Sequence, residues 1–142
     1  MEHVEYVHTT GMSEAALEAR LDEGDHGVLA LADGGAAYAV PLSYRYDGDR
    51  VLLRVSTHDA DSEKRRYLDA TDTATFLRYA ADAEGSWSIQ VRGPVSEWDA
   101  DVDDATVNEW SPPFRLFDEA VADVSFSLYA LDPESVVGRE TV

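Results

Sequence analysis

The residue types best suited to chemistry lie together in one short segment, Ser62-Glu63-Lys64. Lys64 is the only lysine of a chain that also contains ten arginines and 29 acidic residues. Two residues before it, Ser62 can cap a helix that begins at Glu63. A helix N-terminus offers free backbone N–H groups and a partial positive charge, and a lysine adds a point charge. The segment therefore predicts a phosphate site, with a solvent-facing lysine as the alternative.

The elements that would position this segment are strands joined by tight turns. Six strands are predicted, at residues 27–32, 36–46, 50–56, 73–80, 86–98 and 124–131. Their connections carry the glycines that hairpins need, as in Asp33-Gly34-Gly35 and Asp47-Gly48. Most connections are too short for the crossovers of a parallel sheet, so the pattern predicts a small, mostly β, closed barrel.

Short helices are expected at the periphery of this barrel. Ser13 can cap a helix that ends at Gly24, and Ser62 can cap one at residues 63–68. A further helical stretch is expected at about residues 103–121, and residues 135–142 are expected to form a tail.

Two prolines predict irregularities in the strands. Pro41 cannot donate to a strand ladder, so it should lie at an edge or a bulge and interrupt the pairing there. Gly93-Pro94 should bend the longest strand.

Composition limits the function classes. A chain of 142 residues that is 44% hydrophobic fits one domain, residues 1–142. The net charge of −18 disfavours nucleic acid and anionic membranes as partners. No apolar run could span a membrane and the N-terminus is acidic, so a cytoplasmic location is expected.

The composition, with an excess of acidic residues and almost no lysine, resembles that of proteins from extreme halophiles, where molar salt screens the charges. No metal site is expected, because cysteine is absent and the four histidines lack ligand spacing.

The order of these segments resembles the flavin-binding split β-barrel proteins related to pyridoxamine 5′-phosphate oxidase, especially small members and the nitroimidazole-resistance branch. The segments are GVLAL, YAVPLSY, an Asp-Gly turn, VLLRVSTHDADSEK, IQVRG and the terminal Val137-Gly138-Arg139. They cover about residues 25 to 140. The resemblance implies a six-stranded split β-barrel with short peripheral helices, and a homodimer with FMN in a groove between the subunits.

The resemblance also implies contacts with the flavin ring. The strand Tyr38 to Ser43 matches the family segment that lies along the ring, and Val40, Pro41 and Leu42 are the expected ring contacts within it. For Val40 and Leu42 the alternative is a place in the barrel core. Gln90 matches a glutamine that reaches the polar edge of the flavin, with an ordinary strand glutamine as the alternative.

The resemblance further implies phosphate contacts at the end of a strand, in the loop after it and in the segment described first. They are Ser56, Thr57, His58, Ser62 and Lys64. The oxidases carry arginine where this chain has Glu63, so the resemblance implies the loss of one cation. Arg54, Arg65 and Arg66 are the candidates to replace it.

The function implied is a small FMN-dependent oxidoreductase that uses a small-molecule electron donor and acceptor. The residues that bind the substrate phosphate in true oxidases have no counterpart at residues 99–108, so vitamin B6 oxidation is not predicted. No catalytic residue can be nominated, because the flavin performs the electron transfer. The alternatives are a deazaflavin in place of FMN, a flavin-binding module without turnover, and an empty groove used only for dimerisation.

Overall fold

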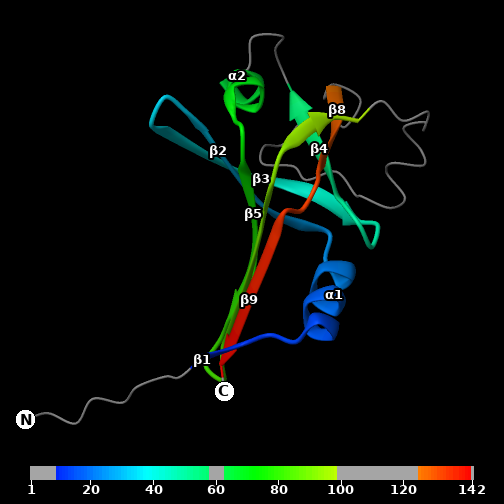
Figure 1. The fold of residues 1–142 in the computed structure, drawn as a ribbon, viewed down its shortest axis with the longest axis vertical. Coiled ribbons are helices and arrows are strands. Elements are labelled where there is room, and N and C mark those ends of the chain that lie inside the picture. Colours follow the sequence, from blue (N-terminus) through cyan, green and yellow to red (C-terminus); the bar gives the residue numbers. More distant parts are fainter. Residues whose placement is uncertain (1–8, 58–62, 99–124, 142) are drawn as a thin grey trace, which may run out of the picture.

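The fold, a computed structural model that describes residues 9–57, 63–98 and 125–141, is a single antiparallel sheet with two helices (Figure 1). Its strands are β1 (Thr9–Gly11), β2 (His26–Asp33), β3 (Ala36–Tyr46), β4 (Val51–Thr57), β5 (Ala74–Ala81), β6 (Ser86–Gly93), β7 (Val95–Glu97), β8 (Ser125–Leu131) and β9 (Ser135–Thr141). The helices are α1 (Glu14–Glu23) and α2 (Glu63–Ala70). The mostly β prediction is confirmed. The helix expected at residues 103–121 lies outside the described residues.

The predicted hairpin turns are confirmed. Gly34 and Gly35 join β2 to β3 with φ angles of 57° and 89°, and Gly48 lies between β3 and β4 with φ at 93°. Residues with a Cβ rarely adopt such angles, so these turns need glycine. In the second turn, the Asp47 carboxylate also accepts a hydrogen bond from the backbone N–H of Arg50 at 2.6 Å.

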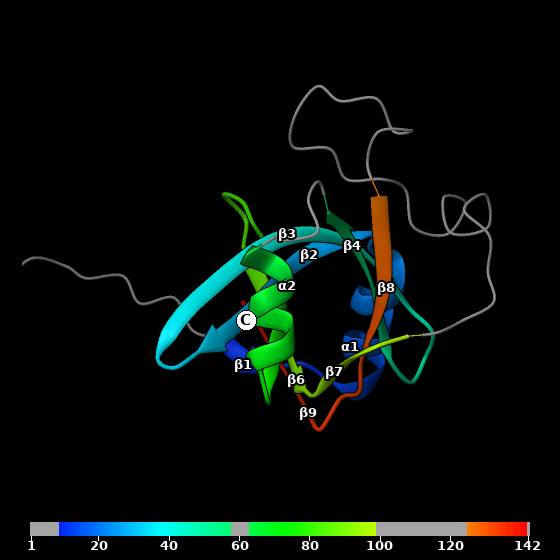
Figure 2. The same ribbon diagram turned by 90° about the horizontal axis from the view of Figure 1, so that it is seen from above.

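The strand count differs from the prediction, since the described residues contain nine strands and not six. The sheet order is β1-β9-β6-β5-β2-β3-β4-β8-β7. Only Pro94 separates β6 from β7, and these two segments pair with β5 and β8 respectively. Hydrogen-bonded neighbours therefore form a ring that runs through β5, β2, β3, β4, β8 and the bent β6–β7 segment (Figure 2). The predicted bend at Gly93-Pro94 is confirmed.

The prediction of a C-terminal tail was wrong, because residues 135–141 form β9. This strand pairs with β6 along its length and with the short β1 at its end. Its sequence, SVVGRET, has a glycine at the centre and no clear alternation of apolar and polar residues. Pairing with a long neighbouring strand, which local sequence does not reveal, makes it a strand.

The core lies inside this ring. Alternate side chains of each strand point inward, and the largest fully buried ones include Leu29, Tyr44, Phe76 and Ile89. The rings of Tyr44 and Phe76 meet at the centre, with centroids 4.7 Å apart. This inward alternation determines which side chains are left on the outside of the barrel.

The helix α1 begins and ends where its local sequence predicts. In α1, the Ser13 side chain accepts a hydrogen bond from Ala16 N at 3.2 Å and Gly24 is the C-cap, as predicted. Leu21 of this helix is buried, and its carbonyl accepts a hydrogen bond from the Tyr44 hydroxyl. The second predicted helix is confirmed as α2, two residues longer than expected at its C-terminal end.

Neither described helix is long and apolar enough to cross a membrane.

Candidate functional site

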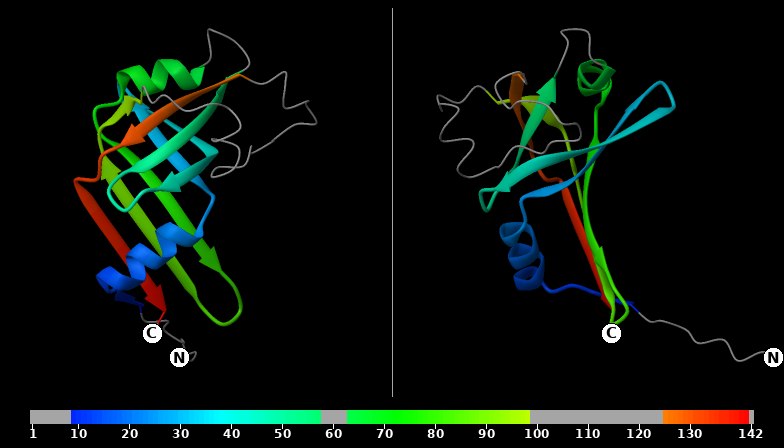
Figure 3. Two further views of the ribbon diagram at one scale, coloured as in Figure 1. Left: turned by 90° about the vertical axis from the view of Figure 1, so that its right-hand side faces the viewer. Right: turned by 180° about the vertical axis from the view of Figure 1, so that it is seen from behind.

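The pairing between β3 and β4 stops half-way along both strands. Ser43 opposite Arg54 is the last pair, and the register runs from there only toward the turn, to Tyr46 opposite Val51. Residues 36–42 of β3 pair with β2 alone, and residues 55–57 of β4 pair with β8 alone. We call this divergence the β3–β4 split, and Figure 3 shows the β2–β3 hairpin pointing away from the end of β4. Backbone groups along the two facing edges do not take part in a β3–β4 ladder, so they can serve a ligand.

Pro41 lies within the unpaired part of β3. Opposite Val28, it is part of a continuous register with β2, and no bulge interrupts that pairing. The predicted edge position is therefore confirmed, and the interruption occurs only on the side of β4. A proline is tolerated here because the split leaves β3 with one partner.

The three residues predicted to contact a flavin ring face different ways. The side chains of Val40 and Leu42 are buried in the core cluster, whereas Pro41 is half-buried on the outside. For the side chains of Val40 and Leu42, the alternative of a place in the barrel core is therefore confirmed. A ring in the split could meet the side chain of Pro41 and the backbone of all three residues.

Two buried polar residues lie where the split begins. Ser43 is 3% exposed and Arg54 is 6% exposed. The residues next to them along each strand point into the core, so the side chains of Ser43 and Arg54 project to the outside of the barrel. Arg54 also lies opposite Leu128 of β8. One of the three candidate arginines is therefore next to the split. The resemblance placed Ser43 at the end of the strand expected along the flavin ring without choosing it as a contact, and only the cross-strand register brings it beside this charge.

The helix α2 lies across the open end of the barrel, near the ends of the β2–β3 hairpin and β4 (Figure 1). Lys64 lies in its first turn and is half-buried, and burial lowers the pKa of its ammonium group. Ser56 and Thr57 end β4, opposite Phe126 and Ser125. His58 and Ser62 lie outside the described residues, in the connection between Thr57 and α2. The chain thus brings the strand end and Lys64 to the same end of the barrel.

Two contacts with the β2–β3 hairpin hold α2 in place. The rings of Tyr38 and Tyr67 stack with centroids 4.9 Å apart and planes within 14°. The Thr71 hydroxyl, just after the helix, accepts a hydrogen bond from Ala32 N at 3.0 Å and donates to Tyr67 O at 2.6 Å. The resemblance included Tyr38 in the strand expected along the flavin ring, but its stacking on Tyr67 of α2 was not predicted from the sequence.

The two arginines of α2 face different neighbours. Arg66 lies 3.9 Å from an Asp33 oxygen and 4.0 Å from a Glu63 oxygen. Arg65 lies on the side of β8, near Tyr129. Burial, and after it the charge of Glu97, raises the pKa of Tyr129, and the charge of Arg65 offsets only part of this rise. Arg66 is therefore engaged with carboxylates, which makes it a poor second cation for a phosphate.

Gln90 is not near the split in the same chain. In the sheet order, β5 and β2 separate its strand from β3, which corresponds to about 14 Å across three strand spacings. Its side chain is exposed on the outside of β6, where its oxygen accepts a hydrogen bond from Arg92 at 3.4 Å. A pocket of about 430 Å³ lies here and is also lined by Tyr79 and Arg139.

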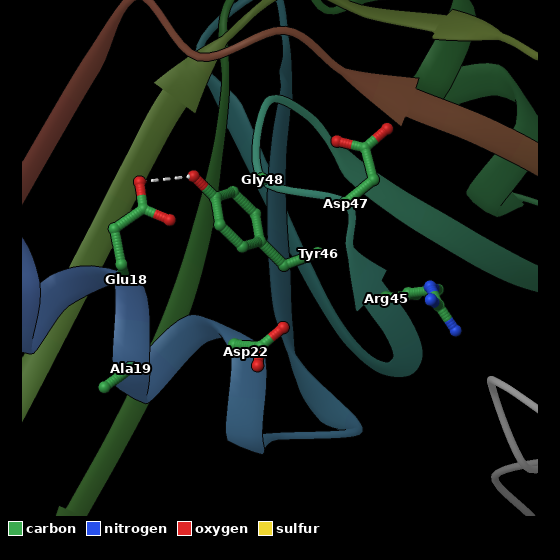
Figure 4. Close-up of a pocket in the computed structure, with 7 residues that line it drawn as sticks. All are labelled: Glu18, Ala19, Asp22, Arg45, Tyr46, Asp47 and Gly48. Carbon is green, nitrogen blue, oxygen red and sulfur yellow. Dashed lines mark hydrogen bonds between the residues drawn. The ribbon is translucent and has the colours of Figure 1, made fainter.

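A second pocket, of about 480 Å³, lies between α1 and the β3–β4 turn (Figure 4). It is lined by Glu18, Ala19, Asp22, Arg45, Tyr46, Asp47 and Gly48. The Tyr46 hydroxyl donates to Glu18 at 2.9 Å, and burial together with this bond raises the pKa of Tyr46 to about 12. Three carboxylates disfavour a phosphate, and the pocket lies at the opposite end of β3 from the unpaired residues. Within the described ranges, no group of three or more potential ligands could hold a metal ion.

Solved structures share this fold. A FAD-binding protein of Mesorhizobium loti superposes with a TM-score of 0.70 at 18% identity, covering 96% of this chain and 99% of that chain. A FAD-binding protein of Mycobacterium smegmatis gives 0.66 at 17% identity, covering 94% and 98%. A candidate 5-nitroimidazole antibiotic resistance protein of Bacteroides thetaiotaomicron gives 0.62 at 16% identity, covering 99% and 95%.

The sequence itself matches a family model. A search of curated proteins finds no match to this sequence. The model described as pyridoxamine 5′-phosphate oxidase, however, matches residues 13–140, nearly the whole chain. The resemblance read from the segments is confirmed, and the chain belongs to the pyridoxamine 5′-phosphate oxidase family.

Proposed function

We propose that this protein binds FMN in the β3–β4 split and acts as a small flavin-dependent oxidoreductase. The observation that carries the proposal is the convergence of two unpaired strand edges and a half-buried lysine at one end of the barrel. Family membership and the flavin-binding names of two structural neighbours support it.

The residues present fit both ends of FMN. Lys64 and the N-terminal N–H groups of α2 would hold the phosphate, with Ser56, Thr57, His58 and Ser62 as further donors. The exposed edge of β3 offers N–H and C=O groups to the polar atoms of the ring, and Pro41 offers an apolar contact. When bound, the flavin supplies the electron transfer, and the protein orients it and limits access of water.

A homodimer is part of this proposal. The outward-facing positions of β2, β5, β6 and β9 contain no acidic residue, although 29 of the 142 residues are acidic. They are His26, Val28, Ala30 and Ala32, Thr75, Leu77, Tyr79 and Ala81, Ser86, Ser88, Gln90 and Arg92, and Ser135, Val137, Arg139 and Thr141. We call this surface the acid-free face.

Two large side chains on the acid-free face are mostly exposed, Tyr79 at 63% and Val137 at 57%. In a chain with this net charge, a sheet face that met solvent would be expected to carry carboxylates, so burial against a second copy accounts for its composition. The face also carries Gln90, which could then meet a flavin only at the interface between copies.

Absorption and mass measurements on the protein purified in high salt test the cofactor. Bound FMN would absorb near 450 nm and be released with the mass of FMN, whereas a deazaflavin would absorb near 420 nm. FAD, which two structural neighbours are named for, would be identified by its mass. A protein that binds no added FMN would refute the proposal. Reduction of the bound flavin by a nicotinamide or a reduced deazaflavin would separate an oxidoreductase from a binding module.

A further inference from the structure

Glu63 presents a problem for the proposed phosphate site. It is the first residue of α2, directly before Lys64, so its carboxylate lies in the same helical turn as the proposed phosphate ligand. A carboxylate in the first turn is itself attracted to the helix N-terminus. It can therefore compete with a bound phosphate for the same N–H groups and repel its charge.

The structure turns this carboxylate toward the β2–β3 hairpin. Arg66 Nη2 lies 4.0 Å from Glu63 Oε1, one helical turn along, and Arg66 Nε lies 3.9 Å from Asp33 Oδ2 at the hairpin end. The guanidinium also lies over the Tyr67 ring, 4.9 Å from its centroid. These three contacts hold Arg66 between helix and hairpin.

A second observation agrees on the direction of Glu63. Desolvation, and after it the charge of Glu63, raises the pKa of Tyr38, a residue of the hairpin. The ring of Tyr38 stacks on Tyr67, so the carboxylate, both tyrosines and Arg66 lie on one side of α2.

We propose that Arg66 is a positioning residue that holds the Glu63 carboxylate against the hairpin and so keeps it from competing with the phosphate for the N-terminus of α2. The inference rests on the proposed function. Arg66 does not touch the phosphate. The effect of Arg66 on FMN affinity should therefore depend on the presence of Glu63. The effect of a direct phosphate ligand, or of a general change in charge, would not depend on Glu63.

A double-mutant cycle tests this dependence. Affinities for FMN and riboflavin are measured by flavin fluorescence quenching at one salt concentration for the parent, Glu63→Gln, Arg66→Gln and the double variant. Both side chains are more than 60% exposed, so the changes should be modest. Removing a charge from the first turn of a helix corresponds to about a 2- to 5-fold change in affinity.

We expect Arg66→Gln to bind FMN about 2- to 5-fold more weakly, because the released Glu63 carboxylate then competes for the helix N-terminus. Glu63→Gln should bind FMN at least as tightly as the parent, in which Arg66 already holds this carboxylate away. In the Glu63→Gln background, Arg66→Gln should have no effect. Riboflavin, which lacks the phosphate, should bind all four proteins equally. Melting temperatures check that each variant is folded.

Arg65→Gln is the matched control, because it removes the same charge from the neighbouring position on the side of Tyr129. Any change it causes should be the same with and without Glu63. The inference is overturned if Arg66→Gln weakens FMN equally in both backgrounds, if it has no effect, or if Arg65→Gln shows the same dependence on Glu63. A parent protein that binds FMN no better than riboflavin would instead refute the phosphate site itself.

Discussion

Replacing Lys64 by alanine gives the most direct test of the proposed phosphate site. A charge-assisted hydrogen bond is worth about 1.5–3 kcal/mol, which corresponds to about a 10- to 150-fold change in affinity. Lys64 is half-buried, so solvent and salt screen part of the interaction. We therefore expect the lower part of this range, about a 10- to 50-fold loss of FMN affinity.

Riboflavin separates the phosphate contact from damage to the fold. Its affinity should not change in Lys64→Ala, whereas a misfolded variant would lose both flavins together. Fluorescence quenching titrations in about 2 M KCl provide both values under conditions that screen the net charge of −18. Lys64→Arg, which retains the charge, should recover part of the FMN affinity. Equal FMN affinities of Lys64→Ala and the parent would refute the assignment of Lys64 and remove the main support for the site.

Three further predictions concern the assembly and its stability. Light scattering in about 2 M KCl should give twice the chain mass of 15.6 kDa, and Tyr79→Glu on the acid-free face should give a monomer, whereas Ala83→Glu in the exposed β5–β6 turn should not. A monomeric parent that still binds flavin would contradict the dimer. Lowering the salt to about 0.1 M should reduce the melting temperature, because the charges of the acidic chain then repel one another over about 10 Å; an unchanged value would refute the halophilic interpretation. Burial raises the pKa of Tyr44 from 10.0 to about 12, so its contribution to stability is complete below pH 10 and is lost as the pH rises through 12. Alkaline unfolding followed by circular dichroism should show this loss, and Tyr44→Phe should show less of it.

Local chemistry made the hairpins and helix ends predictable. The turns at Gly34-Gly35 and Gly48 need positive φ angles, which glycine adopts at little cost, and the Ser13 side chain caps the first turn of α1. Such signals involve only three or four neighbouring residues, so they can be recognised from the sequence without knowledge of the tertiary structure. The order of the motifs was also sufficient for the family assignment, which the match to residues 13–140 confirms.

Features that depend on distant strands could not be predicted. Whether residues 135–141 form a strand depends on β6, about 50 residues earlier in the chain, and the sequence of β9 alone suggested a tail. The point where β3 leaves β4 is likewise set by the global register. Pro41 predicted an interruption, but it could not show that the pairing with β2 continues while that with β4 ends at Ser43.

The sequence alone determined which residues could form the site, because charge, hydrogen-bonding groups and motif spacing belong to the residues themselves. The single lysine after Ser62-Glu63 was enough to predict a phosphate site, which stays a prediction. Only the tertiary structure decided how the side chains face. It buried Val40 and Leu42 in the core, moved Gln90 to another face and set Arg66 between Asp33 and Glu63. The physical reason is that the direction of a side chain depends on which face of its strand it occupies and on contacts with residues far away in the sequence. These contacts form only when the barrel closes.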